Sequence, residues 1–393
     1  MQKIQGEVFE IQGIRDILNG QAQLSADLIN DKYRRGEIRI ITEQARYPID
    51  SITTMLDSKK YKLNPEYQRR KRWDNLRKSR LIESFIMNVP IPPIFLYEVN
   101  YSEYEVMDGL QRLTTIYDFY DGQFRLEGLL YWKELNGMTY NELPSEVQKG
   151  IDRRYLSSIV LLQETAKNRT EAESLKQIVF ERLNSGGEKL EPQEIRNALY
   201  NGSFNQKCIT LAENKHFKEM WNIVDFNQQP KQASESYRKM EDVELVLRFF
   251  AYRFIDKLSG YTVEKFLDEY LKEANKFNNT TIQQLEKLFS ETIETVFTIF
   301  GKKAFVLPKI KRETSKPTKT VYDPLMQSVA IFILDGKKDL LIQNATILSS
   351  AKFADESKII NSEGKALFDG RYNSNIEVSK RILYFNDLIN SNI

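Results

Sequence analysis

Cysteine and histidine are almost missing from this chain of 393 residues. The single cysteine, Cys208, excludes a disulfide framework and a cysteine-based zinc site. The single histidine, His216, lies in an ordinary helical pattern, for which a structural role is expected. With one histidine, the sequence does not support an HNH nuclease, a HExxH protease or a histidine-paired nucleophile. No GxGxxG fingerprint supports hydride chemistry on a dinucleotide either.

Long apolar runs are also missing from the sequence. No segment approaches the ~18 apolar residues that a membrane span needs. The N-terminus lacks the basic start and apolar run of a signal peptide. We therefore expect a cytoplasmic protein without membrane association. Because the net charge is only +2, any attraction to nucleic acid must come from a local basic surface.

Two kinds of periodicity divide the chain. Up to about residue 202, short apolar runs alternate with helical patterns, and "IFLYEV" and "YEVMD" predict a hairpin at residues 94–108. Beyond that point, long amphipathic segments predict helices. The fold class expected is α+β. Its parts are an N-terminal extension at 1–40, a domain with a small mixed sheet at 41–202, and a mainly α-helical domain at 203–393.

Local signals predict several element boundaries. Asp50 and Asp74 each precede an apolar helical pattern, so each is expected to cap a helix with its side chain. Pro192 and Gly202 are expected to bound a further helix. Residues 307–323 are polar and contain proline, which predicts an internal loop of the helical domain.

Residues 108–112, DGLQR, lie between a predicted strand and a predicted helix. The glycine lets a ligand approach the backbone, and a helix start offers free N–H groups with a partial positive charge. Arg112 can bind phosphate oxygens, Gln111 can orient a water or a base edge, and Asp108 can hold Mg²⁺ through water. A tight turn with a solvated arginine is the alternative that five residues leave open.

A basic block extends from Lys59 to Arg80, with ten Lys and Arg against two acidic residues. Such a block can neutralise phosphates, and Tyr67 and Trp73 can stack on bases. A solvated face with Trp73 in the core is the alternative. The residues expected to contact DNA are Arg70, Lys71, Arg72, Arg77 and Lys78.

A third motif, "FERLNSGGEKLEPQEIRNAL", occupies residues 180–199. Helix capping explains its glycines and its proline. Capping does not explain why Arg and Asn recur as two pairs, Arg182 with Asn184 and Arg196 with Asn197. The two arginines are therefore candidates for facing one anion.

In this order, the three motifs resemble the N-terminal domain of GmrSD-type restriction proteins, which is related to the ParB/sulfiredoxin fold. The resemblance is strong over about residues 40–202 and continues more weakly into the helical part. It implies a ParB-like nucleotide-binding domain with a D-G-Q-Q-R motif and a role in bacterial defence against foreign DNA. Some members of the family hydrolyse NTP, so the resemblance also suggests NTP hydrolysis by this chain.

Carried over residue by residue, the family motif is matched by Asp108, Gly109, Gln111 and Arg112, whereas Leu110 replaces its first glutamine. The resemblance implies catalytic roles for Asp108, Gln111 and Arg112, with Asp108 as the metal ligand. The residues expected to bind the nucleotide are Tyr67, Gln68, Arg69, Gly109, Arg112, Arg182, Asn184, Arg196 and Asn197.

The leading hypothesis is an NTP-binding, NTP-hydrolysing component of a bacterial restriction or antiphage system, working with Mg²⁺ and DNA. Many relatives attach an HNH-type nuclease, which one histidine cannot build, so a separate nuclease subunit is an expected partner. A non-enzymatic DNA-binding adaptor that recruits such a nuclease is one alternative. A metal-dependent nuclease is another, with candidate carboxylates Asp108, Glu83, Glu105 and Glu194.

Overall fold

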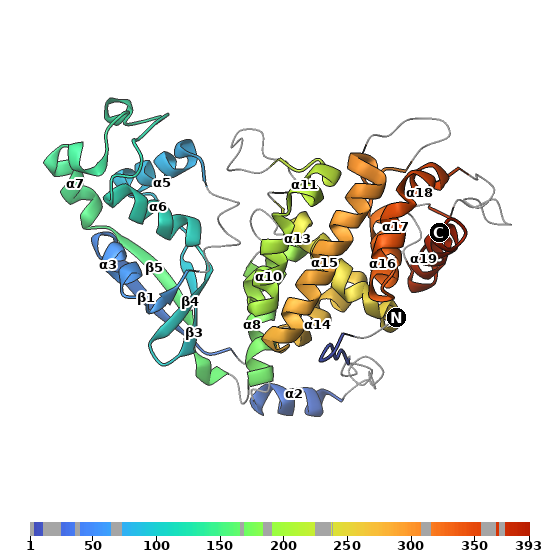
Figure 1. Ribbon diagram of the computed structural model, residues 1–393. Coiled ribbons are helices and arrows are strands. Elements are labelled where there is room, and N and C mark those ends of the chain that lie inside the picture. The colour runs from blue at the N-terminus through green and yellow to red at the C-terminus, as the bar shows by residue number, and fades with distance from the viewer. Residues whose placement is uncertain are drawn as a thin grey trace. The chain divides into compact units, whose positions relative to one another are not determined.

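The computed structural model (Figure 1) describes residues 4–10, 25–35, 40–63, 73–165, 169–183, 191–224, 237, 239–307, 316–354, 367–368 and 374–393. The chain divides into two compact units. The α/β unit is Arg15–Leu190, and the helical unit combines Met1–Ile14 with Glu191–Ile393. The second boundary falls at Glu191, so in this division the helix at Pro192–Leu199 lies in the helical unit, and the domain bounds at 41–202 stay a prediction.

A mixed five-stranded sheet forms the centre of the α/β unit, with strand order β1-β5-β3-β4-β2. β3 pairs antiparallel with β4 and parallel with β5, while β1 pairs antiparallel with β5. The α+β class, the small mixed sheet and the predicted hairpin are thereby confirmed. The strands are β1 (Thr42–Pro48), β2 (Tyr61–Lys62), β3 (Ile94–Asn100), β4 (Glu103–Asp108) and β5 (Tyr155–Leu161).

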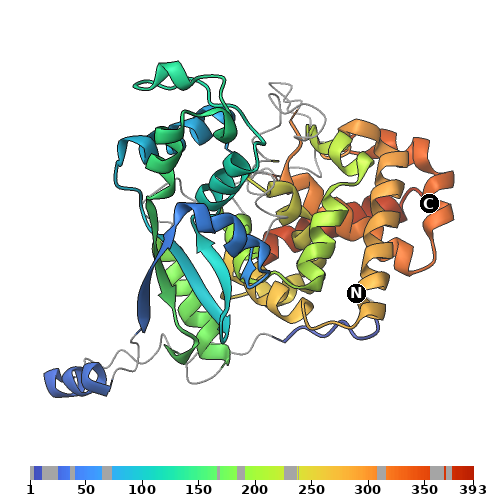
Figure 2. The same ribbon diagram turned by 90° about the vertical axis from the view of Figure 1, so that its left-hand side faces the viewer.

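Helices cover both faces of this sheet. Leu96 and Val106 point into a core shared with α3 (Ile52–Asp57), α5 (Asn75–Met87), α6 (Leu110–Tyr120) and α7 (Ser145–Asp152). Their neighbours along the strands, Tyr97 and Glu105, point to the opposite face because side chains alternate. There Lys176 of α8 (Arg169–Leu183) pairs with Glu105 at 2.6 Å, and Figure 2 shows α8 behind the strands.

The two helix caps predicted from aspartate have different outcomes. Asp74 caps α5, because its Oδ1 accepts from the Arg77 N–H at 2.8 Å. The cap predicted at Asp50 is wrong. Asp50 lies inside a 3₁₀ turn, Ile49–Ser51, and α3 starts directly after that turn without a side-chain cap.

The helical unit confirms the helices predicted beyond residue 203. Within the described residues of the whole chain, no helix combines the length and the hydropathy that crossing a bilayer requires. The main helices of the helical unit are α9 (Pro192–Leu199), α10 (Ser203–Ala212), α11 (Lys215–Trp221), α13 (Glu241–Ala251), α14 (Val263–Ala274), α15 (Asn279–Phe300), α16 (Lys319–Leu334), α17 (Lys338–Gln343), α18 (Ala345–Ala351) and α19 (Asn375–Asn390).

The loop predicted at 307–323 is wrong at its end. α16 already begins at Lys319, where the Thr318 side chain accepts from the Thr320 N–H. Val321 and Tyr322 are fully buried, so tertiary packing continues the helix through residues that look polar on average. Residues 308–315 of that segment lie outside the described residues.

His216 has the structural role expected from the sequence. It lies in the first turn of α11, and its ring stacks on Phe297 of α15 at 4.0 Å between centroids.

The N-terminal segment, residues 4–10, is an integral part of the helical unit. Glu7 is buried and forms a bidentate ion pair with Arg253, whose Nη2 lies 2.8 Å from Glu7 Oε2. Phe9 packs edge-on against Phe254, Phe266 and Tyr270. Two stretches of the helical unit that are 246 residues apart in sequence are therefore joined by a buried charge pair.

A buried carboxylate on α5 organises the loop between α6 and α7. Glu83 is 3% exposed and accepts from the backbone N–H groups of Leu130, Tyr131 and Trp132 at 3.2, 2.7 and 3.0 Å. Burial alone would raise the pKa of the Glu83 carboxyl. The three N–H groups and the nearby Arg80 guanidinium outweigh burial and hold that pKa below its ordinary value of 4.5.

We predict that Glu83→Gln destabilises the α/β unit at pH 7 by about 1–3 kcal/mol, because an amide is a weaker acceptor than a carboxylate. A lowered folded-state pKa means that the stabilisation is complete above pH 4.5 and is lost as the pH falls through the lower folded value. The difference between wild type and variant should therefore shrink as the pH falls below 4.5. Urea unfolding across that range measures it, with the exposed Glu127→Gln as the control that should change little.

Candidate functional site

The DGLQR motif forms the turn from β4 into α6. β3 pairs through Phe95 with Asp108 and through Leu96 with Val106, which leaves Met107 as an extra residue in β4. A bulge of this kind bends the strand and redirects the side chain beside it, here Asp108.

Gly109 is required in this turn for two reasons. Its φ is 94°, a left-handed conformation, and it is the N-cap of α6 without a side-chain cap bond. A Cβ at this position would lie 2.4 Å from the Cγ2 atom of Ile94. Side-chain atoms of Ile94 and Arg112 occupy the space that a Cβ at residue 109 would take, so the turn needs a residue without a side chain.

Arg112 lies against the same turn. Its Nη2 donates to Asp108 Oδ2 at 2.7 Å and to the Pro93 carbonyl at 3.3 Å. The Arg112 side chain is 14% exposed and the Asp108 side chain 46% exposed. Arg112 Nε is buried and has no hydrogen-bond partner within the described residues. A charged donor left in this state is costly unless a ligand or a water accepts from it.

Gln111 joins the DGLQR turn to the end of the basic block. Its Oε1 accepts from the Trp73 backbone N–H at 3.1 Å. Trp73 is half-buried against the core, and the next residue, Asp74, caps α5. Two motifs that are about 40 residues apart in sequence therefore meet at one point.

Leu110, the residue that departs from the family motif, points into the protein. It is 6% exposed and belongs to the core cluster of the α/β unit. An apolar side chain fits that environment without an unpaired polar group. The substitution leaves the bare backbone of Gly109 and the side chain of Arg112 in place.

The structure describes only some of the other candidate residues of the α/β unit. Arg77 and Arg182 are exposed on α5 and α8, whereas Lys78 is largely buried and pairs with Asp118 at 2.7 Å. Lys78 also lies over the Phe124 ring, which makes it a structural residue as well as a DNA-binding candidate. The candidates outside the described residues are Tyr67, Gln68, Arg69, Arg70, Lys71, Arg72 and Asn184.

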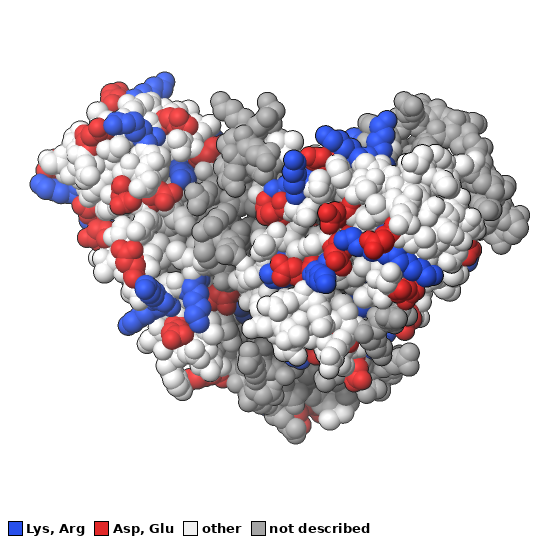
Figure 3. Space-filling model, in the orientation of Figure 1, with Lys and Arg blue, Asp and Glu red and all other residues white. Residues whose placement is uncertain are grey.

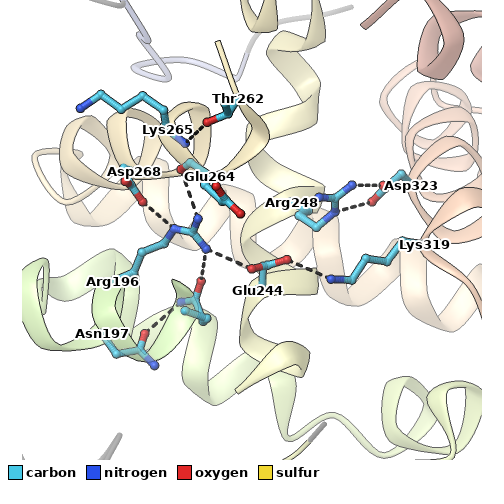
Figure 4. Close-up of polar contacts among 11 residues, drawn as sticks. Arg196, Asn197, Glu244, Arg248, Thr262, Glu264, Lys265, Asp268, Lys319 and Asp323 are labelled. Atoms are coloured by element: carbon cyan, nitrogen blue, oxygen red, sulfur yellow. Dashed lines mark hydrogen bonds and ion pairs between the residues drawn. The ribbon is translucent and has the colours of Figure 1, made fainter. Parts of the chain in front are cut away.

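Arg196 belongs to the helical unit, where its guanidinium makes four hydrogen bonds (Figure 4). Nε donates to Asp268 at 2.7 Å, Nη1 to Glu244 at 3.1 Å and Gln193 at 3.2 Å, and Nη2 to the Glu264 carbonyl at 3.1 Å. The side chain is 1% exposed. It holds α9, α13 and α14 together.

Asn197 is also buried beside α13. Its Oδ1 accepts from Gln193 Nε2 at 2.9 Å, and its Nδ2 donates to the Met240 sulfur at 2.8 Å. The contacts of Arg196 and Asn197 explain both residues by packing within the helical unit. Their proposed role in nucleotide binding stays a prediction.

A polar cleft of about 370 Å³ opens next to Arg196, bounded by the first turns of α9, α13, α14 and α16. Its lining cations are each paired with a carboxylate: Arg196 with Glu244, Arg248 with Asp323, Lys239 with Glu191, and Lys319 with Glu244. Lys and Arg are likewise interspersed with Asp and Glu over the face of the helical unit that Figure 3 shows. Sequence reasoning missed this cleft, because the pairs join residues that are distant in sequence.

The carboxylates named for a metal-dependent nuclease have separate tasks. Glu83 holds the 130–132 backbone, Glu105 pairs with Lys176, and Glu194 closes a capping box at the start of α9 in the helical unit. Among the residues that the structure describes, no group of three or more His, Cys, Asp or Glu side chains could hold a metal ion.

Comparison with known protein families places this geometry in context. Residues 52–201 match the family described as GmrSD restriction endonuclease, N-terminal domain. No curated protein and no solved structure matches the chain. The fold and the glycine turn thus define a mixed-sheet domain with a candidate anion site. Residues 52–201, which include β2 to β5, match a GmrSD-type N-terminal domain, as the motifs of the sequence indicate.

We predict that Gly109→Ala destabilises the α/β unit more than Gly122→Ala does. Both glycines have a positive φ, 94° and 71°, so both substitutions cost about 1–2 kcal/mol of backbone strain. Only at residue 109 would the new Cβ meet other atoms, whereas at 122 nothing lies within 4 Å. Overpacking should add about 1–3 kcal/mol. Equal urea midpoints for the two variants would contradict this account of the turn.

We predict that Arg196→Met lowers the free energy of unfolding by about 3–5 kcal/mol, because Glu244 and Asp268 lose a buried partner. Burial already raises the pKa of Asp268, and without Arg196 both carboxyls should have a higher pKa. The folded variant then binds extra protons, so its deficit should be larger at pH 8 than at pH 5. Lys239→Met, which breaks a half-exposed pair on the same cleft, should cost below about 1 kcal/mol.

Proposed function

We propose that the chain binds a nucleoside triphosphate at the Gly109 turn and hydrolyses it, as a component of a bacterial restriction system acting on foreign DNA in the cytoplasm. The observation that carries the proposal is the buried Nε of Arg112, which has no hydrogen-bond partner among the described residues and lies in the first turn of α6, next to its glycine N-cap. The family match supports the restriction role. A ParB-like relationship for the sheet domain is part of the same proposal.

The residues of the turn fit a phosphate chain. Arg112 would donate from Nε to a phosphate oxygen while Asp108 and the Pro93 carbonyl hold its Nη2 in place. The N–H groups at the start of α6 would add donors and a partial positive charge. Preorganised donors of this kind stabilise the charge of a transferring phosphoryl group.

Gln111 and Asp108 complete the proposed chemistry. Gln111 uses its oxygen for Trp73, and within the described residues its amide nitrogen has no bond, so it can orient an attacking water. Water would add to the γ-phosphorus as the bond to the β-phosphate oxygen breaks, which yields a diphosphate and inorganic phosphate. Asp108 would hold Mg²⁺ through water, which fits a half-exposed carboxylate, and the ion would neutralise phosphate charge.

DNA cleavage in this proposal belongs to a separate nuclease subunit, because the chain has one histidine and that histidine stacks on Phe297. The basic block from Lys59 to Arg80 would bring the DNA, with the exposed Arg77 as one contact. The adaptor alternative, binding without hydrolysis, has one specific observation in its favour. Leu110 is an inward-facing apolar residue where the family motif has a polar one.

We predict that Arg112→Ala weakens NTP affinity about 10–100-fold and lowers phosphate release, because a charge-assisted bond of about 1.5–3 kcal/mol is lost. Fluorescent NTP binding and phosphate release with Mg²⁺ measure the two effects. Arg125→Ala removes an exposed arginine of the same unit, paired with Glu142, and should leave both unchanged. Equal binding and equal rates in Arg112→Ala and wild type would overturn the proposal.

NTP binding without phosphate release in the wild type would support the adaptor alternative, and Leu110→Gln would then test whether the residue at position 110 limits turnover.

A further inference from the structure

The loop between α6 and α7 exposes three consecutive large residues at its tip. Leu130, Tyr131 and Trp132 are 59, 74 and 40% exposed. We propose that this tip, residues 130–132, stacks on unpaired bases of DNA, as they occur in single strands or in a locally opened duplex. The inference rests on the proposed function only in taking DNA as the target, and it does not depend on NTP hydrolysis.

The tip is held rigidly although its side chains are exposed. Glu83 accepts from all three backbone N–H groups of the tip. Ser79, one turn earlier on α5, accepts from the Glu127 N–H at 2.9 Å, and Asn136 Oδ1 accepts from the Leu129 N–H at 3.1 Å. A preorganised loop loses little conformational entropy when it binds a partner.

The tip is exposed although the rest of the loop packs against the core of the α/β unit. The loop residues on either side, Leu126, Leu129 and Leu135, are 1, 3 and 4% exposed and anchor the loop in the core of the α/β unit. Gly128 has a φ of 63° and approaches Leu76 so closely that a Cβ would lie 2.3 Å from its Cδ1. The backbone is therefore folded so that alternate parts of the loop point inward and outward.

Two cations accompany the exposed rings. The Arg80 guanidinium lies close enough to Glu83 to lower the pKa of that carboxyl, and Glu83 contacts the tip directly. Lys133 follows Trp132 in the chain. Both side chains are exposed, and neither makes an ion pair with a residue that the structure describes. They can each contact a phosphate beside a stacked base.

These features favour nucleic acid over a purely apolar partner. Tyr and Trp rings stack on any base and contribute about 1–3 kcal/mol per base, while free cations nearby suit the phosphates. Glu127 and Glu134 are also exposed on the loop, so the attraction to the backbone is weak. Stacking should then dominate, and it needs bases that are not paired and stacked within a duplex. Binding through the tip should consequently depend less on salt than binding through the basic block.

The test compares three fluorescein-labelled DNAs by anisotropy: an oligo-dT strand, a matched duplex and a duplex with a central unpaired bubble. Tyr131→Ala and Trp132→Ala should each weaken binding of the strand and the bubble about 5–100-fold, with little change for the matched duplex. Trp132→Phe should retain most of the affinity, because a ring remains. Tyr101→Ala is the matched control, since Tyr101 is 80% exposed at the β3–β4 turn of the same unit, and it should change nothing.

Unchanged affinity in both alanine variants, or no DNA binding by the wild type at low salt, would overturn the inference and leave a protein partner as the occupant of the tip. A loss that extends equally to the matched duplex would also overturn it, because stacking on unpaired bases predicts selectivity. NTP binding and phosphate release are measured on the same variants. Both should remain at wild-type values, so a failure of the DNA arm is distinguishable from a failure of the proposed nucleotide site.

Discussion

Buried arginine–carboxylate pairs on α13 and the turn that follows it hold together a helical unit whose two parts are far apart in sequence. Arg253 binds Glu7 of the N-terminal segment, and Glu244 binds Arg196 of α9. The α/β unit is inserted in sequence between these two anchored segments. Removing one partner would leave a buried charge without compensation, which is far more costly than losing a surface pair. These pairs therefore determine where the inserted unit leaves and rejoins the helical unit along the chain.

The sequence predicted local features well, because their signals lie within a few residues. The Asp74 cap, the β3–β4 hairpin and the helix that Pro192 begins all follow from neighbours in the chain. The carboxylate partners of Arg196 are 48 and 72 residues away in sequence, and no sequence periodicity predicts them. For the same reason the sequence could not show that Glu83 reaches the 130–132 backbone. The start of α16 was missed because residues 307–323 are polar on average, although Val321 and Tyr322 within them are buried.

The candidate site was predicted in the same uneven way. The DGLQR turn has the glycine, the helix start and the arginine that its sequence suggests. The contact between Gln111 and Trp73 joins the first two motifs, which sequence order alone could not establish. In the third motif, Arg196 and Asn197 both bind neighbours within the helical unit, which gives these two residues a structural role as well. The recurrence of Arg and Asn as two pairs within one motif therefore does not by itself mean that the residues face one ligand.

A single helix connects the two proposed contacts of the α/β unit. α5 begins beside Trp73, whose N–H binds Gln111 of the candidate phosphate turn, and it continues through Ser79 and Glu83, which hold the exposed tip. Its 13 residues span about 20 Å at 1.5 Å per residue. A helix is stiff over that length, so a displacement of the first turn of α5 would be passed on to Ser79 and Glu83. If nucleotide binding displaced α5 through that contact, the tip would move with it, and DNA binding at the tip would then by linkage change the affinity for nucleotide.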